Sequence, residues 1–204
     1  MIITKDNKEP LVDIRKACPE ILIGDINKRI LKKYGALVRK TVAGMLNKAQ
    51  KNLPKEMRLI IDSVWRPSGY QKEIFKSSVK RFSKLHPKWD RKRILREVNK
   101  YVAFWKGKYA SGHMTGGAVD VRIVKNNRKI PMSTKKLPYQ EAAKTYSKKL
   151  PSYLKRNRQI LIKAMTKAGF SNYPKEFWHC SYGDYWWAKR ENKKLAIYGV
   201  INLN

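Results

Sequence analysis

The sequence predicts an α+β fold, in which helices pack on a small antiparallel sheet. Amphipathic helical segments and short apolar strands are mixed along the chain, which is typical of this fold class. With 204 residues, the chain is long enough for one domain with its own core. No segment has the composition of a linker between two domains. We therefore expect a single domain over residues 1–204.

Several segments are predicted to be helical. In the first, side chains such as Val42 and Leu46 recur at the spacing of one helical face, and Pro54 ends the run. Pro67 suits the first turn of the second helix, and Gly169 suits the end of the last one. The second and third helices have densely basic outer faces. The expected helices are residues 36–53, 67–84, 89–104, 139–147 and 152–168.

Strands are expected where short apolar runs lie between these helices. The run RLIIDSVW, residues 58–65, reads as a core strand, and Pro67 limits its continuation. In AVDVRIV, residues 118–124, apolar and polar positions alternate, so Asp120 points away from the apolar side. Residues 11–34 are expected to be irregular except for a short strand at 20–23. The other expected strands are residues 59–64, 118–124, 177–182 and 194–199.

Two short segments hold the residues that carry chemistry. SGHMTGGAVD, residues 111–120, contains His113 and Asp120, and EFWH, residues 176–179, contains Glu176 and His179. A catalytic zinc ion takes three imidazole or carboxylate ligands and keeps a fourth position open for water or substrate. His113, Asp120 and His179 would fill the three positions. Glu176 would then take the proton from the water, whose pKa such a metal lowers to about 7.

The spacing supports this site and poses one problem. Gly116 and Gly117 allow a sharp turn that brings His113 beside the strand of Asp120. Glu176 and His179 are three residues apart, so on a regular strand they would face opposite ways. A bulge or an irregular start of the strand, just after Pro174, is therefore required.

The chain resembles the D-alanyl-D-alanine dipeptidases of the VanX type, which are zinc peptidases related to the DD-carboxypeptidases. SGHMTGGAVD and the distant EFWH carry the resemblance. Further matches extend it over nearly the whole chain; they are LVDIRKACPEI (11–21), WRPSGYQ (65–71), SYGDYWWA (181–188) and AIYG (196–199).

The resemblance assigns a role to each site residue. It makes His113, Asp120 and His179 the zinc ligands of one Zn²⁺ per chain, and Glu176 the general base. It makes Arg66 the cation that stabilises the oxyanion, and Ser111 a residue that binds the amino terminus of the substrate. The family also has an aspartate after the second ligand that pairs with this ammonium group. Residues 131–140 contain no acid, and Glu141 is the nearest substitute, which leaves strict dipeptide specificity open.

The activity that the resemblance implies is zinc-dependent hydrolysis of D-alanyl-D-alanine by metal-bound water. One alternative is a DD-carboxypeptidase or endopeptidase that acts on peptidoglycan stem peptides. A second alternative is a non-catalytic basic protein that binds polyanions and keeps only the scaffold. A broken ligand or base would favour this second alternative, and neither is broken in this sequence.

Charge and location add further expectations. The chain has 47 Lys plus Arg against 15 Asp plus Glu, a net charge of +32, which attracts polyanions. We interpret the charge first as a solvated lysine-rich surface, then as attraction to an anionic cell-wall polymer, and last as nucleic-acid binding.

The two cysteines form no disulfide framework. No apolar run has signal or membrane-span length, so we expect no membrane insertion and a cytoplasmic location, or a periplasmic or secreted one after removal of a leader.

Overall fold

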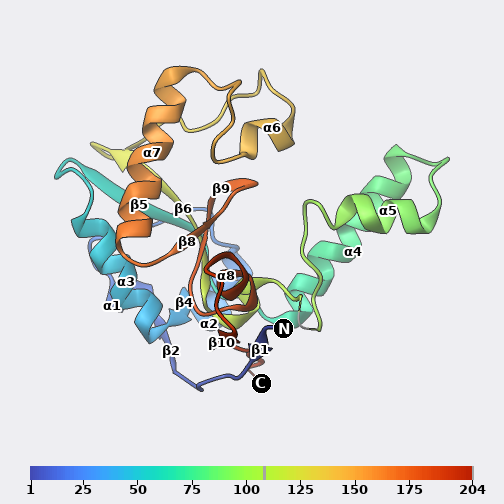
Figure 1. Ribbon diagram of the computed structural model, residues 1–204, viewed down its shortest axis with the longest axis horizontal. Coiled ribbons are helices and arrows are strands. Elements are labelled where there is room, and N and C mark those ends of the chain that lie inside the picture. The colour runs from blue at the N-terminus through green and yellow to red at the C-terminus, as the bar shows by residue number, and fades with distance from the viewer. Residues whose placement is uncertain (108, 204) are drawn as a thin grey trace.

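A mixed sheet forms the centre of the molecule, and the α+β fold class is confirmed (Figure 1). The computed structural model describes residues 1–107 and 109–203. The strands of this sheet run in the order β3-β5-β6-β9-β8, and β7 pairs with β6. They are β3 (Leu22–Ile23), β5 (Met57–Ser63), β6 (Ala118–Lys125), β7 (Arg128–Lys129), β8 (Ser171–Tyr173) and β9 (Glu176–Ser181).

The pairing of these strands is antiparallel except between β3 and β5, which are parallel. The expected all-antiparallel sheet is wrong at this edge, because a long helical crossover joins these two strands.

The main hydrophobic core lies on one face of the sheet. Helices α3 (Lys40–Lys51) and α7 (Ser152–Lys167) cover that face (Figure 1). Val119, Val121 and Ile123 of β6 are fully buried in this core, whereas Asp120 and Arg122 are only partly buried. The alternation predicted for residues 118–124 is therefore confirmed, and the polar positions of β6 belong to the opposite face.

The amino-terminal third contains more regular structure than we expected. Leu37–Arg39 form β4, which pairs with β2 (Leu11–Asp13), so the first long helix begins only at Lys40. The expected start at residue 36 is wrong because apolar side chains such as Val38 fit both a helix and a strand, and pairing with β2 selects the strand. The irregular segment also contains α1 (Ile14–Ala17) and α2 (Lys28–Tyr34).

Helices α4 (Ser68–Leu85) and α5 (Arg91–Val98) form an arm that projects from the sheet (Figure 1). Phe75, Ile94 and Val98 form its own small hydrophobic cluster. The expected helix 89–104 is wrong after Val98, because the chain folds back there. The ring centroids of Phe104 and Trp105 lie 5.3 and 5.1 Å from that of Phe75.

The carboxyl-terminal half also contains short elements outside the central sheet. Its remaining elements are α6 (Tyr139–Ala143), α8 (Tyr185–Arg190) and β10 (Leu195–Ala196). Helix α8 was not expected, although Asp184 caps its first turn by accepting a hydrogen bond from the Trp187 amide. Strand β10 is shorter than expected and pairs with β1 (Ile3–Thr4) in a separate two-stranded sheet. Among the described residues, no helix is both long and apolar enough to cross a membrane.

The segment around α6 depends on one buried arginine. The Arg158 side chain is 1% exposed and donates hydrogen bonds to the backbone carbonyls of Met132, Ala142 and Lys144. Its guanidinium carbon lies 4.0 Å from the ring centroid of Phe177, next to Glu176 in β9. Arg158 therefore ties α7 to the α6 segment and to β9.

We predict that Arg158→Met lowers the free energy of unfolding by about 3 kcal/mol, because it leaves buried carbonyl groups without donors. Urea denaturation measures this change. Arg156→Met is the matched control, since Arg156 is exposed on the same helix and should change stability by less than about 0.5 kcal/mol. Equal stabilities of the two variants would contradict this role for Arg158.

Candidate metal centre

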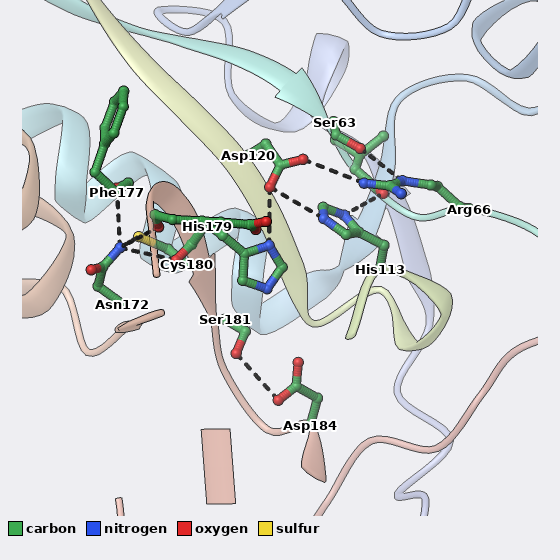
Figure 2. A network of polar contacts seen from close by, with 12 residues as sticks. Ser63, Arg66, His113, Asp120, Asn172, Phe177, His179, Cys180, Ser181 and Asp184 are labelled. Carbon is green, nitrogen blue, oxygen red and sulfur yellow. Dashed lines mark hydrogen bonds and ion pairs between the residues drawn. The ribbon is translucent and has the colours of Figure 1, made fainter. Parts of the chain in front are cut away.

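Three side chains from three elements meet on the polar face of the sheet (Figure 2). His113 comes from the short 3₁₀ helix η1 (Gly112–Thr115), Asp120 from β6 and His179 from β9. The strand register places Asp120 directly opposite His179. One nitrogen or oxygen atom from each of the three side chains lies within 4.8 Å of the others. The structure thus brings together the three residues that the sequence suggested as ligands.

Asp120 is the centre of this group. Its Oδ1 lies 3.3 Å from His113 Nε2 and 3.0 Å from His179 Nδ1. Its Oδ2 accepts a hydrogen bond from Arg66 Nη2 at 3.3 Å. Burial opposes ionisation of this carboxyl group, but contacts with the two histidines outweigh burial and hold its pKa well below the usual range. Asp120 is therefore ionised at neutral pH.

Backbone packing fixes the position of His113. A Cβ atom at Gly112 would lie 2.0 Å from Asp184 Oδ2, so only glycine allows η1 to approach α8 this closely. Gly116 ends η1 with a φ of 74°, in the left-handed region that glycine adopts without strain. The sharp turn that we predicted at the glycine pair is present there. It leads the chain directly from His113 into β6.

The protonation of His113 follows from its contacts. Its Nδ1 lies 3.0 Å from the Val64 carbonyl oxygen, which can only accept, so Nδ1 carries the proton. Burial, and then the positive charge of Arg66, lower the pKa of His113 to about 4. The ring is therefore neutral, and its Nε2 presents a lone pair to the site. A backbone carbonyl that orients a histidine in this way is a common support of metal ligands.

Strand β9 solves the spacing problem of Glu176 and His179. Tyr173 pairs with Glu176, but the preceding residue of β8, Asn172, pairs with Cys180, so β9 contains extra residues between these two pairs. Phe177 and Cys180 are both buried in the core. The required irregularity after Pro174 is confirmed, and Glu176 and His179 can share the opposite side.

Glu176 lies within electrostatic reach of the three-residue group but is not one of its members. Burial raises the pKa of its carboxyl group; the charge of Asp120 acts in the same direction, and the charges of His179 and Arg66 oppose it. His179 is affected as well: burial lowers its pKa, but the hydrogen bond and charge of Asp120 outweigh burial and raise it.

Arg66 occupies the rim of the group just after β5. Its Nε donates to Ser63 Oγ at 3.0 Å, and its Nη1 donates to Gln71 Oε1 at 3.1 Å. Together with the bond to Asp120, these contacts hold the guanidinium plane in one orientation (Figure 2). Gln71 is 1% exposed and also donates to the Ala103 carbonyl, which links the arm to the site.

The other two candidate residues have different surroundings. Ser111 is 5% exposed and precedes η1, two residues before His113. Glu141 lies on α6, where its carboxylate accepts hydrogen bonds from Lys144 Nζ and Ser147 Oγ, both at 2.6 Å. Ser111 is therefore a buried neighbour of η1 in the chain, whereas the Glu141 carboxylate is bound by its own neighbours.

Several residues that orient the site were not found from the sequence. Gln71 and Ser63 bind Arg66, the Val64 carbonyl orients His113, and Asn172 binds the backbone of β9. Single polar residues of this kind carry no spacing signal. Gln71 alone gave a hint, since it closes the segment WRPSGYQ.

Comparisons with known proteins identify a family and one related protein. A family model described as D-ala-D-ala dipeptidase, Peptidase_M15, matches residues 9–194. A D-alanyl-D-alanine dipeptidase of Synechocystis sp. is 32% identical over 108 residues, which cover 44% of this chain and 43% of that relative. The match therefore spans less than half of the length of this relative.

Two solved structures are also similar to the chain. A structure of VanYB in complex with D-Alanine-D-Alanine is 17% identical, with a TM-score of 0.46, and the match covers 74% of each chain. A Zn(II) complex of a mutant of VanY, a vancomycin resistance D,D-pentapeptidase, is 15% identical, also with a TM-score of 0.46. That match covers 89% of this chain and 86% of the other.

The family assignment rests on the family model, which covers nearly the whole chain and includes all the candidate site residues. The chain belongs to the Peptidase_M15 family, whose model is described as D-ala-D-ala dipeptidase.

Proposed function

We propose that this protein is a zinc-dependent peptidase that hydrolyses the peptide bond of D-alanyl-D-alanine. The observation that carries the proposal is the convergence of His113, Asp120 and His179 on one point, with Glu176 and Arg66 beside them. The D-alanyl-D-alanine substrate is suggested by the family and by the Synechocystis relative. A polyanion-binding protein without activity would have no need of this arrangement.

The three side chains fit a zinc ion in chemistry and in spacing. Zinc binds imidazole nitrogen and carboxylate oxygen at about 2.0–2.2 Å, so ligand atoms in a tetrahedral site lie about 3.3–3.6 Å apart. The two nitrogen atoms lie 3.3 and 3.0 Å from Asp120 Oδ1, so a small outward movement of His179 would admit the ion. The lone pair of His113 Nε2 faces this carboxylate oxygen. Both atoms are acceptors, and a divalent cation would be bound by both of them.

Glu176 is the residue that we assign to proton transfer. A zinc ion bound by the three side chains would supply a Lewis acid that polarises the scissile carbonyl and lowers the pKa of a water molecule. The Glu176 carboxylate takes the proton of the attacking water and passes it to the leaving amine. Burial raises the pKa of this carboxyl group, which helps it to hold the proton between these two steps.

Arg66 is the residue that we assign to the oxyanion. Three of the five N–H groups of a guanidinium are occupied here, by Ser63, Gln71 and Asp120. The remaining two can donate to the negative oxygen that develops on the scissile carbonyl. Since the guanidinium is already oriented by its neighbours, it needs little reorganisation during the reaction.

We take the free dipeptide as the substrate and longer peptidoglycan stem peptides as the second candidate. One observation favours the second: the Glu141 carboxylate, the nearest substitute for an acidic anchor, is bound by Lys144 and Ser147. A free dipeptide has an ammonium group that needs a counter-charge, whereas an acylated stem peptide has none. Release of D-alanine only from an acylated stem peptide would establish the second candidate.

We predict that the protein binds one zinc ion per chain and that His179→Ala lowers zinc affinity by at least about 100-fold, because a ligand is lost. Competition with a chromophoric chelator measures the affinity. His86→Ala is the matched control: the ring of His86 stacks on Trp89 in the arm, at 3.7 Å between centroids. A loss of affinity in this control, or none in His179→Ala, would contradict the site.

We predict that Glu176→Gln lowers alanine release from D-alanyl-D-alanine by about 100- to 10,000-fold, the usual contribution of a general acid or base, while bound zinc is retained. A ninhydrin assay of zinc-loaded protein measures the release. The control is Glu191→Gln, since Glu191 is exposed after α8. Activity of Glu176→Gln within tenfold of the unmodified protein would rule out this base.

A further inference from the structure

Strand β9 must do two things that a regular strand cannot. It buries Phe177 and Cys180 in the core, and it presents Glu176 and His179 to the other side, three residues apart. Pairing with β6 holds only its later part, through His179, Cys180 and Ser181. The earlier part, with Glu176, has one paired residue in β8, which is Tyr173. Another group must therefore donate hydrogen bonds to the backbone carbonyls between these two parts of β9.

The side chain of Asn172 occupies this place (Figure 2). Its Nδ2 donates to the carbonyl oxygens of Phe177 and His179, both at 3.0 Å, and lies 3.3 Å from that of Glu176. An amide group has two N–H donors, so these carbonyls share them. The backbone of the base and the backbone of the ligand are thus bound to one amide group.

Thr145 fixes the orientation of that amide. Its Oγ1 donates to Asn172 Oδ1 at 2.6 Å, and its backbone N–H donates to the Pro174 carbonyl at 3.0 Å. Thr145 is 5% exposed and follows α6. The amide oxygen thus faces a donor, and the carbonyls of Glu176, Phe177 and His179, which can only accept, place the amide nitrogen on the side of β9.

We propose that Asn172 is a positioning residue that sets the distance between Glu176 and the metal-binding His179. The proposal rests on the proposed function, since it assumes that Glu176 transfers the proton. Asn172 acts through the main chain and does not contact the reacting groups. Without its amide N–H groups, the carbonyls of Glu176 and Phe177 lose their donor, and the turn relaxes toward regular alternation. His179 stays in place through β6, but Glu176 moves away.

The test uses Asn172→Asp, which has the same shape but replaces the donor by an acceptor. We expect kcat to fall by about 10- to 100-fold, as for a displacement of about 1 Å in a catalytic group, with KM and zinc affinity within about threefold. In the zinc-free protein, hydrogen exchange should become faster in residues 174–179 and stay unchanged in residues 118–125. Asn47→Asp is the control, because Asn47 Nδ2 also donates to a backbone carbonyl, that of Ala17, at 2.9 Å.

A milder variant covers the case in which Asn172→Asp does not fold. Thr145→Val keeps the shape of the side chain and removes the Oγ1 donor, so it should change kcat and exchange in the same directions by smaller factors. Unchanged exchange in residues 174–179 in both variants, or loss of zinc affinity in parallel with kcat, would overturn the proposal. If the unmodified protein cleaves no D-alanyl peptide, the proposed function fails, and the exchange measurement alone decides whether Asn172 holds β9.

Discussion

The site depends on one carboxylate at the centre of the sheet. Asp120 lies on β6, which is paired on both sides, with Ser63 of β5 and with His179 of β9 opposite it. One of its oxygens faces both imidazoles and the other accepts from Arg66. Because β6 is an interior strand, it cannot move without disrupting the main core. Every other functional group is placed relative to this fixed point.

The surroundings keep two of the three potential ligands, His113 and Asp120, in the state that a metal requires. Metal binding needs a neutral imidazole and an ionised carboxylate. The Val64 carbonyl and burial make His113 neutral, and the hydrogen bond and charge of His179 help to keep Asp120 ionised. The positive charge of Arg66 favours both the neutral form of His113 and the ionised form of Asp120. In a chain with a net charge of +32, carboxylates are scarce, and this centre uses two of the 15.

Local patterns were enough to predict the residues that meet at the centre, but not the contacts that orient them. The alternation around Asp120 and the turn at Gly116 were visible because each depends on its immediate neighbours. Helix α2 has weak sequence signals at its ends, Asn27 as the cap of its first turn and Gly35 after its last residue. Because the helix is short, no apolar periodicity accompanies these signals. Strand β4 could not be predicted, since pairing with β2 decides it. The same holds for Asn172, whose role exists only once β8 and β9 are side by side.

The metal centre is tested most directly by X-ray absorption at the zinc edge of the zinc-loaded protein. We expect two imidazole nitrogens and at least one carboxylate oxygen at about 2.0–2.2 Å, and no sulfur. Cys180 is next to His179 but is buried on the core side of β9, so it should not bind. A sulfur ligand at about 2.3 Å, or a shell without imidazole, would contradict the metal centre at Asp120.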